Sequence, residues 1–171
     1  QLEAMRAEFP KIIPIMSTIS YETDTRFGTA EDFRARLERA CGQPVIHTIA
    51  QAEPIGPKKL LDVLVIAPCT GNTLAKLANG IADTPVTLAA KAHLRNERPI
   101  VIAVSTNDAL AGNAENIGKL LARGHYFFVP MRQDNAIKKP RSVVADFTRL
   151  PETIRAALDG RQLQPLLAAP A

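Results

Sequence analysis

Small polar residues separate an apolar segment from a helical pattern in residues 61–83. Residues 61–66 are almost all apolar, which is typical of a strand buried in a parallel sheet, and Pro68 is expected to end that strand. From Leu74 onward, apolar residues recur every three or four positions, which predicts an amphipathic helix. Residues 69–73 place hydroxyls, an amide and backbone N–H groups at the start of this helix, and such an end attracts anions. The sequence therefore predicts a ligand-binding turn.

A second polar turn follows a second apolar segment. Residues 99–104 read as a buried strand, and Ser-Thr-Asn-Asp follows at 105–108. The carboxyl ends of parallel strands meet at one edge of a sheet, where open α/β sheets bind ligands. We therefore expect residues 105–108 to share a pocket with residues 69–73. The alternative for each turn is an ordinary connection with a helix cap.

The first quarter of the chain contains a third polar segment. Residues 2–9 are expected to form the end of an amphipathic helix, and residues 12–16 read as a strand near an edge because Pro14 lacks an N–H donor. A hydroxyl-rich loop follows at 17–25, again after a strand end. This loop is expected on the same ligand side of the sheet.

Strand and helix patterns alternate along the rest of the chain. Thr29 and Thr84 are expected to cap helices over about 30–41 and 85–94, and Gly124 is expected to end a further helix in a left-handed conformation. Other expected elements are a helix at 115–123, a strand at 125–129 and a helix at 151–158 closed by Gly160. This alternation predicts a single α/β domain over residues 1–171, with three layers and a mostly parallel sheet.

Two segments lack a clear pattern. Periodicity fades over residues 131–148, so this segment is expected to be an ordered loop that acts as a lid or a subunit contact. Residues 161–171 are expected to form a mobile, apolar C-terminal tail.

Composition limits the classes of partner. The chain has a net charge of +4, is 46% hydrophobic and only 5% aromatic, and contains neither a basic helix nor a long apolar run. Membrane insertion and nucleic-acid binding are therefore not expected, whereas an anionic small ligand suits the positive charge. We expect a soluble, cytoplasmic protein.

The cysteines and histidines are not expected to bind a metal or to react. Cys41 and Cys69 lie far apart in the chain, which favours free thiols in a reducing compartment. Cys69 is interpreted as a small buried side chain, since no histidine is close to it in sequence. His47, His93 and His125 share no metal-ligand spacing with the cysteines, so no metal site is expected.

Residues 67–83, A-P-C-T-G-N-T-L-A-K-L-A-N-G-I-A-D, resemble a known signature. The signature is P-A-S-A-N-T-x-x-K-x-x-x-G-I-x-D, of the flavoprotein family that includes the flavin-containing cysteine decarboxylases. The resemblance implies a Rossmann-like fold, bound FMN near a subunit interface and a homo-oligomer, with Asn72 as the catalytic residue. It implies flavin contacts from Ser17, Thr18, Pro68, Thr70, Gly71, Asn72, Thr73, Ser105, Thr106 and Asn107. The family's first strand and phosphate-binding loop have no match after Gln1, so we expect native residues upstream.

Within this family, several connecting segments resemble one member, which is one of the two subunits of a synthase that forms an aromatic dicarboxylate. These segments are residues 53–63, 104–111, 137–148 and 162–167. The resemblance implies oxidation of a ring precursor, together with a partner subunit that carries an NAD(P)-binding domain. A dicarboxylate substrate requires cationic side chains, and the candidates are Arg26, Lys76, Lys138, Lys139 and Arg141.

Two alternative functions remain open. The chain could be a non-catalytic accessory subunit if the partner performs the redox step. It could also be an FMN-dependent decarboxylase of a cysteinyl substrate, although the histidine and the cysteine-bearing clamp of those enzymes have no match here.

Overall fold

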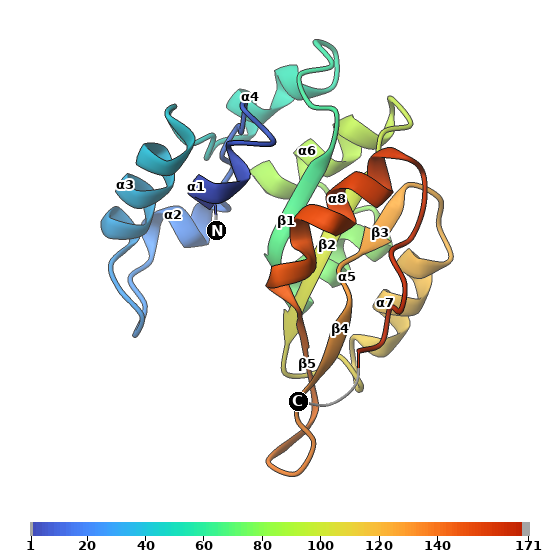
Figure 1. Cartoon of the computed structure of the whole chain (residues 1–171). Helices are drawn as coiled ribbons and strands as arrows, with labels where there is room; N and C mark the ends of the chain where they lie inside the picture. The colour runs from blue at the N-terminus through green and yellow to red at the C-terminus, as the bar shows by residue number, and fades with distance from the viewer. Residues whose placement is uncertain (1, 169–171) are drawn as a thin grey trace.

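The computed structural model describes residues 2–168 and has a mixed five-stranded sheet at its centre (Figure 1). Strand β2 pairs in parallel with β1 and β3 and antiparallel with β5, which in turn pairs antiparallel with β4. The strands are β1 (Leu64–Cys69), β2 (Ile100–Thr106), β3 (Tyr126–Phe128), β4 (Met131–Asn135) and β5 (Lys139–Ala145). The three-layer α/β fold expected from the sequence is confirmed, with three parallel strands extended by two antiparallel ones.

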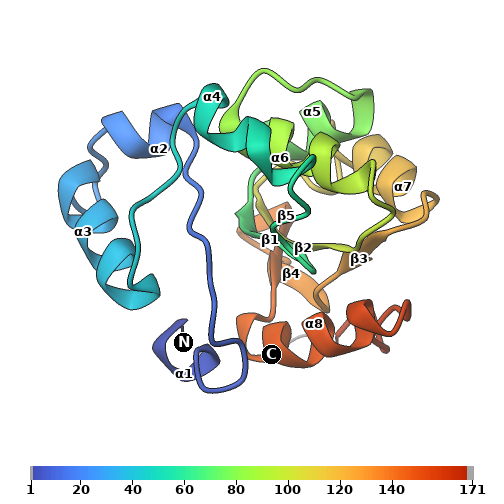
Figure 2. The ribbon, with the colours of Figure 1, turned by 90° about the horizontal axis from the view of Figure 1, so that it is seen from above.

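Helices cover both faces of this sheet (Figure 2). Helices α5, α6 and α7 lie on one face together with α4, and α8 lies on the other; α1, α2 and α3 lie to one side. Their bounds are α1 (Leu2–Met5), α2 (Thr18–Glu22), α3 (Ala30–Cys41), α4 (Ile49–Ala52), α5 (Gly71–Asn79), α6 (Pro85–Leu94), α7 (Ala114–Leu121) and α8 (Leu150–Leu158). Short 3-10 helices span Glu53–Ile55 and Phe147–Arg149. None of the helices described in residues 2–168 has the length and apolar character needed to cross a membrane.

Strand β2 joins two hydrophobic cores, because its side chains alternate between the two faces of the sheet. Ile100, Ile102 and Val104 pack into the core beneath α5, α6 and α7. Val101 and Ala103 pack into the second core, beneath α8. All five residues are fully buried, and each large apolar side chain buried in this way stabilises the fold by about 1.5–3 kcal/mol. Strand β2, whose carboxyl end leads into the second polar turn, is therefore held by packing on both faces.

The predicted helix starts are confirmed at both caps. The Thr29 hydroxyl accepts a hydrogen bond from the Asp32 N–H at 3.1 Å, and α3 runs over the predicted residues until Gly42, at φ 72°. Thr84 forms a reciprocal capping box with Thr87 at the start of α6, where Pro85 is the first helical residue.

The N-terminal predictions are only partly correct. Helix α1 ends at Met5, and the predicted strand at 12–16 forms a single bridge, between Ile15 and Ile46. The predicted loop at 17–25 contains helix α2, because the Ser17 hydroxyl caps the Ser20 N–H. Apolar contacts then join α1 to the core beneath α8, and Glu8 forms an ion pair with Arg155 at 2.6 Å.

Strand β1 does not end before Pro68 as predicted; it continues to Cys69. The pairing with β2 shifts register here, from Ile66 opposite Ile102 to Cys69 opposite Val104. A register irregularity accommodates a proline, which has no N–H to donate to the ladder. Strand β2 likewise includes Ser105 and Thr106, which the sequence pattern places in a turn.

Residues 131–148 are not the predicted loop. Strands β4 and β5 form a hairpin there, followed by a 3-10 helix. The hairpin could not be predicted from the sequence, because both faces of its outer half are exposed and its residues therefore show no alternation of apolar and polar side chains. Its possible role as a lid stays a prediction.

Two predictions near helix ends are also wrong. The left-handed residue after α7 is His125, at φ 70°, and not Gly124. The C-terminal segment is attached rather than mobile up to residue 168, since Met131 exchanges backbone hydrogen bonds with Leu166 and Ala168, each of 2.9 Å. The rest of the predicted tail, residues 169–171, lies outside the described residues.

Candidate functional site

The turn between β1 and α5 lies against the turn that follows β2. Gly71, the first residue of α5, has no side chain, and a Cβ atom placed on it would clash with the Asn113 amide nitrogen. The same atom would lie 2.8 Å from the Thr106 hydroxyl and 2.9 Å from an Asp108 carboxylate oxygen. The structure thus brings the two polar turns into contact, and glycine is what permits this approach.

Asp108 is the centre of the second turn. Its carboxylate accepts hydrogen bonds from the Thr106 hydroxyl at 2.6 Å and from the Asn113 amide at 2.7 Å. These two bonds stabilise the ionised form and lower the pKa of Asp108 below its ordinary value. The Asn113 amide oxygen accepts a further bond from Asn116 at 3.0 Å, so the carboxylate belongs to a connected network.

Sequence reasoning places Asp108 in the expected shared pocket only as one residue of the segment 105–108, and it gives Asn113 no role. Asp108 is recognisable only as part of a polar turn, and Asn113 lies five residues further along the chain. The available signal is the position of Asn113 two residues before the helix predicted from residue 115, since asparagine is favoured near a helix start as a cap. In the structure its side chain makes no cap bond and instead binds Asp108.

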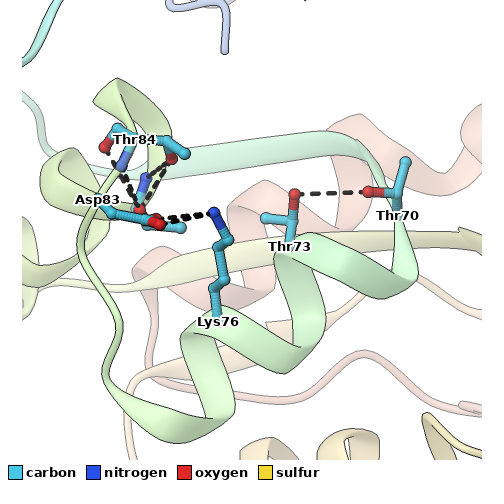
Figure 3. Close-up of polar contacts among 6 residues, drawn as sticks. Thr70, Thr73, Lys76, Asp83 and Thr84 are labelled. Carbon is cyan, nitrogen blue, oxygen red and sulfur yellow. Dashed lines mark hydrogen bonds and ion pairs between the residues drawn. The ribbon is translucent and has the colours of Figure 1, made fainter. Parts of the chain in front are cut away.

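The first turn of α5 retains free donors. Thr70 precedes the helix, but its side chain makes no cap hydrogen bond; its hydroxyl lies 3.5 Å from that of Thr73 (Figure 3). Asn72, between them, is exposed. The first N–H groups of a helix have no partner within it, so this uncapped end presents donors to a ligand.

Lys76 continues the same face of α5 but is already paired. Its ammonium group lies 2.8 and 2.9 Å from the two carboxylate oxygens of Asp83, just before the cap of α6 (Figure 3). Hydrogen bonding to Lys76 lowers the pKa of Asp83. The Lys76 side chain is only 21% exposed, so it joins α5 to the start of α6 as well as bordering the turn.

Cys69 does not supply a nucleophile. It is fully buried at the end of β1, and this burial raises the pKa of its thiol to about 12. The thiol is therefore protonated near neutral pH, and a thiol without a thiolate form is a poor nucleophile. Cys41 is also a free, buried thiol.

The family follows from a comparison of this chain with known proteins. A family model described as "Flavoprotein" matches residues 31–158. The chain belongs to the flavoprotein family. The B subunit of dipicolinate synthase from Bacillus subtilis (strain 168) is 45% identical to this flavoprotein over 167 residues, covering 98% of this chain and 84% of the relative.

Solved structures resemble this flavoprotein over most of its length. The crystal structure of the dipicolinate synthase B subunit from Bacillus halodurans is 42% identical, with a TM-score of 0.89 over 99% of this chain and 89% of the other. The fold is also similar to that of Burkholderia xenovorans DmrB in complex with FMN, at a TM-score of 0.63 with 19% identity over 91% of this chain and 86% of the other. The second likeness concerns the fold alone.

Other predicted site residues make contacts of their own, and their part in the site stays a prediction. Ser17 bonds to Ser20, and no hydrogen bond among residues 2–168 joins Ser17 or Thr18 to the β1–α5 turn. The Arg26 guanidinium stacks on the Phe27 ring, 4.7 Å from its centroid. In the described part of the chain, no group of three or more histidine, cysteine, aspartate or glutamate side chains is placed to hold a metal ion.

The hairpin brings one predicted cation close to the second turn. The Arg141 carbonyl on β5 accepts a backbone hydrogen bond from Leu110 at 3.0 Å, and the Arg141 side chain is exposed. The buried Ser142 hydroxyl next to it donates to the Asn107 side chain at 3.3 Å. Lys138 is exposed nearer the hairpin tip, where neighbouring Lys139 is paired with Asp134 at 2.7 Å.

The donor set at the β1–α5 turn fits a flavin. A flavin ring carries carbonyl oxygens and ring nitrogens that accept hydrogen bonds, and the turn offers the free N–H groups of α5, the hydroxyls of Thr70 and Thr73 and the Asn72 amide. The network of Asp108 and Asn113 lies against Gly71, at the start of the helix that carries these donors.

Proposed function

We propose that this flavoprotein binds FMN and is the B subunit of a dipicolinate synthase, taking part in the oxidation of a dihydrodipicolinate-type precursor to dipicolinate during sporulation. The observation that carries the proposal is 45% identity to the Bacillus subtilis protein over 98% of this chain. This similarity covers the connecting segments as well as the flavin motif. It therefore points to one member of the family, whereas the motif alone indicates only the family.

In this proposal the two polar turns hold the flavin and orient the substrate. Thr70, Asn72 and Thr73 face the ring, and the second turn with Thr106 and Asn107 completes the pocket. A bound flavin supplies two-electron redox chemistry. The protein contributes hydrogen-bond donors that are already in place before the ligand binds. The hydrophobic cores on the two faces of the sheet hold the strands that lead into the two turns.

The substrate is a dianion and requires cationic partners. Arg141 is the best placed of the candidate cations Arg26, Lys76, Lys138 and Arg141, because strand β5 places it next to the second turn. A guanidinium binds a carboxylate through two parallel hydrogen bonds, which fixes the orientation of the ring as well as its charge.

We further propose that the protein works in the cytoplasm as a homo-oligomer together with the A subunit of dipicolinate synthase, which would carry NAD(P). A non-catalytic accessory role is the second candidate, and one observation favours it. Asp108 and Cys69, the ionisable groups of the two turns, have pKa values displaced away from neutrality in opposite directions. Neither is suited to exchange a proton at neutral pH.

Formation of dipicolinate from its dihydro precursor by both purified subunits tests this proposal. We expect turnover to require FMN and this chain, and to be lost in Asn72→Ala. Asn79→Ala makes the same change at the other end of α5, where the side chain only bonds to the Ala75 carbonyl at 2.8 Å, and should retain activity. Full turnover by the A subunit with NAD(P) alone would instead establish the accessory role.

A further inference from the structure

A pocket of about 330 Å³ lies at the far end of α5 from the two turns. It is lined by the end of α5, by α6 and by the start of β3. Leu77, Ile81 and Leu94 are its large aliphatic lining residues, here called the apolar floor, and Lys91, Arg95 and Arg123 are among the remaining lining residues. The pocket is large enough for a small organic molecule.

The charged residues that line this pocket are all basic. No acidic residue lines it, and none of the salt bridges found among residues 2–168 involves Lys91, Arg95 or Arg123. Three cations beside an apolar floor complement a molecule with an anionic group on an apolar body.

Cations are often found at helix ends because they bind terminal carbonyls, and one of the three has this role. Arg123 donates to the carbonyl oxygens of Leu77 at 3.2 Å and Ala78 at 2.8 Å, which anchors its guanidinium at the pocket wall. The terminal carbonyls of α6 are bonded by backbone instead: Lys91 accepts from the Arg95 N–H and His93 from the Asn96 N–H. The side chains of Lys91 and Arg95 are therefore not needed as caps.

Tyr126 adds a neutral donor to this wall. It is 8% exposed, and burial raises the pKa of its hydroxyl, so the group stays protonated. A protonated phenol next to Arg123 can donate to an anionic oxygen.

We propose that this pocket binds a small organic carboxylate, with its charge at Lys91 and Arg95 and its apolar body on Leu77, Ile81 and Leu94. The pocket lies at the opposite end of α5 from the proposed flavin site, and its binding of a carboxylate does not depend on the proposed function. Carboxylate binding draws on charge-assisted hydrogen bonds and on burial of apolar surface, which are both available here.

Titration with benzoate, followed through the methyl NMR signals of the apolar floor, tests this proposal. We expect saturable shifts of the Leu77, Ile81 and Leu94 methyls, and binding weaker by about tenfold or more for neutral benzamide, which lacks the charge. Inorganic phosphate, which has charge but no apolar body, is expected to bind more weakly than benzoate.

The double variant Lys91→Ala/Arg95→Ala should weaken benzoate binding by about tenfold or more. Arg36→Ala/Arg39→Ala removes the same charge from the exposed surface of α3 and should leave binding unchanged. Absence of saturable shifts, or equal affinity in the two double variants, would overturn the proposal. Phosphate that binds as tightly as benzoate would overturn the role of the apolar floor.

Discussion

Gly71 and Asn113 stand at the starts of two different helices and lie so close that a methyl group added to Gly71 would clash with the Asn113 amide nitrogen. This contact links the start of α5 to the start of α7. Because Asn113 also donates to Asp108, the position of the carboxylate network depends on the absence of a side chain at residue 71.

Gly71→Ala should therefore destabilise the protein, by about 1–3 kcal/mol, since the methyl must displace polar groups that are held by hydrogen bonds. Urea unfolding measures the change. Gly118→Ala is the matched control, because a Cβ at Gly118 meets open space and alanine is the better helix former, so stability should rise by up to about 1 kcal/mol. Equal stability of Gly71→Ala and wild type would contradict the close contact.

The Asp108 network predicts a specific dependence on pH. Hydrogen bonds from Thr106 and Asn113 lower the pKa of Asp108 in the folded state, so the stability they contribute is present above the unfolded value of about 3.9 and is lost as the pH falls through the folded value. Asp108→Asn should consequently lose less stability than wild type between about pH 5 and pH 2, as followed by urea unfolding.

Carbon-13 NMR of the Asp108 carboxyl measures its pKa in the folded protein directly. Thr106→Val removes the donor at 2.6 Å and should raise the pKa of Asp108 toward its ordinary value, whereas Thr106→Ser keeps a hydroxyl and should preserve the lowered pKa. An unchanged pKa in Thr106→Val would show that this hydrogen bond does not tune the carboxylate.

Gln162 covers part of the open edge of β3. Its side-chain oxygen accepts from the Phe128 N–H at 2.8 Å, and its nitrogen donates to the Phe128 carbonyl at 2.7 Å. Gln162→Leu keeps the side-chain volume but leaves both backbone groups of a fully buried residue without these partners, which should cost about 1–3 kcal/mol of stability.

Gln133→Leu is the control for this edge. Gln133 is exposed and makes one side-chain hydrogen bond, to the Pro140 carbonyl at 2.9 Å, so its replacement should change stability by less than about 0.5 kcal/mol. Thermal unfolding compares the stability of the two variants, and Gln162→Leu should have the lower melting temperature. A Gln162→Leu protein as stable as Gln133→Leu would show that water replaces the lost bonds.

The parts of the fold that follow from local chemistry could be predicted from the sequence. Thr29 and Thr84 cap their helices as expected because a hydroxyl before a helix satisfies an N–H that otherwise has no partner. The buried strand β2 was recognisable because both of its faces are covered by apolar layers, which requires a continuous apolar run.

Other features depend on contacts that sequence spacing does not reveal. The close approach of Gly71 to Asn113 joins residues far apart in the chain, and it depends on the glycine having no side chain. The β4–β5 hairpin has few buried side chains in its outer half, so nothing in its apolar pattern distinguishes it from a loop. The two turns were nevertheless expected to share a pocket, because each follows the carboxyl end of a predicted parallel strand. The structure shows that these two strands are neighbours.

Equilibrium binding of FMN to the full-length protein tests the central claim most directly. The account predicts saturable uptake of flavin, visible in the absorbance of the protein after gel filtration, and a loss of affinity of about tenfold or more in Asn72→Ala with an unchanged melting temperature, since Asn72 is exposed. A protein that stays colourless in excess FMN, or an Asn72→Ala variant that binds FMN as tightly as wild type, would contradict a flavin site at the β1–α5 turn.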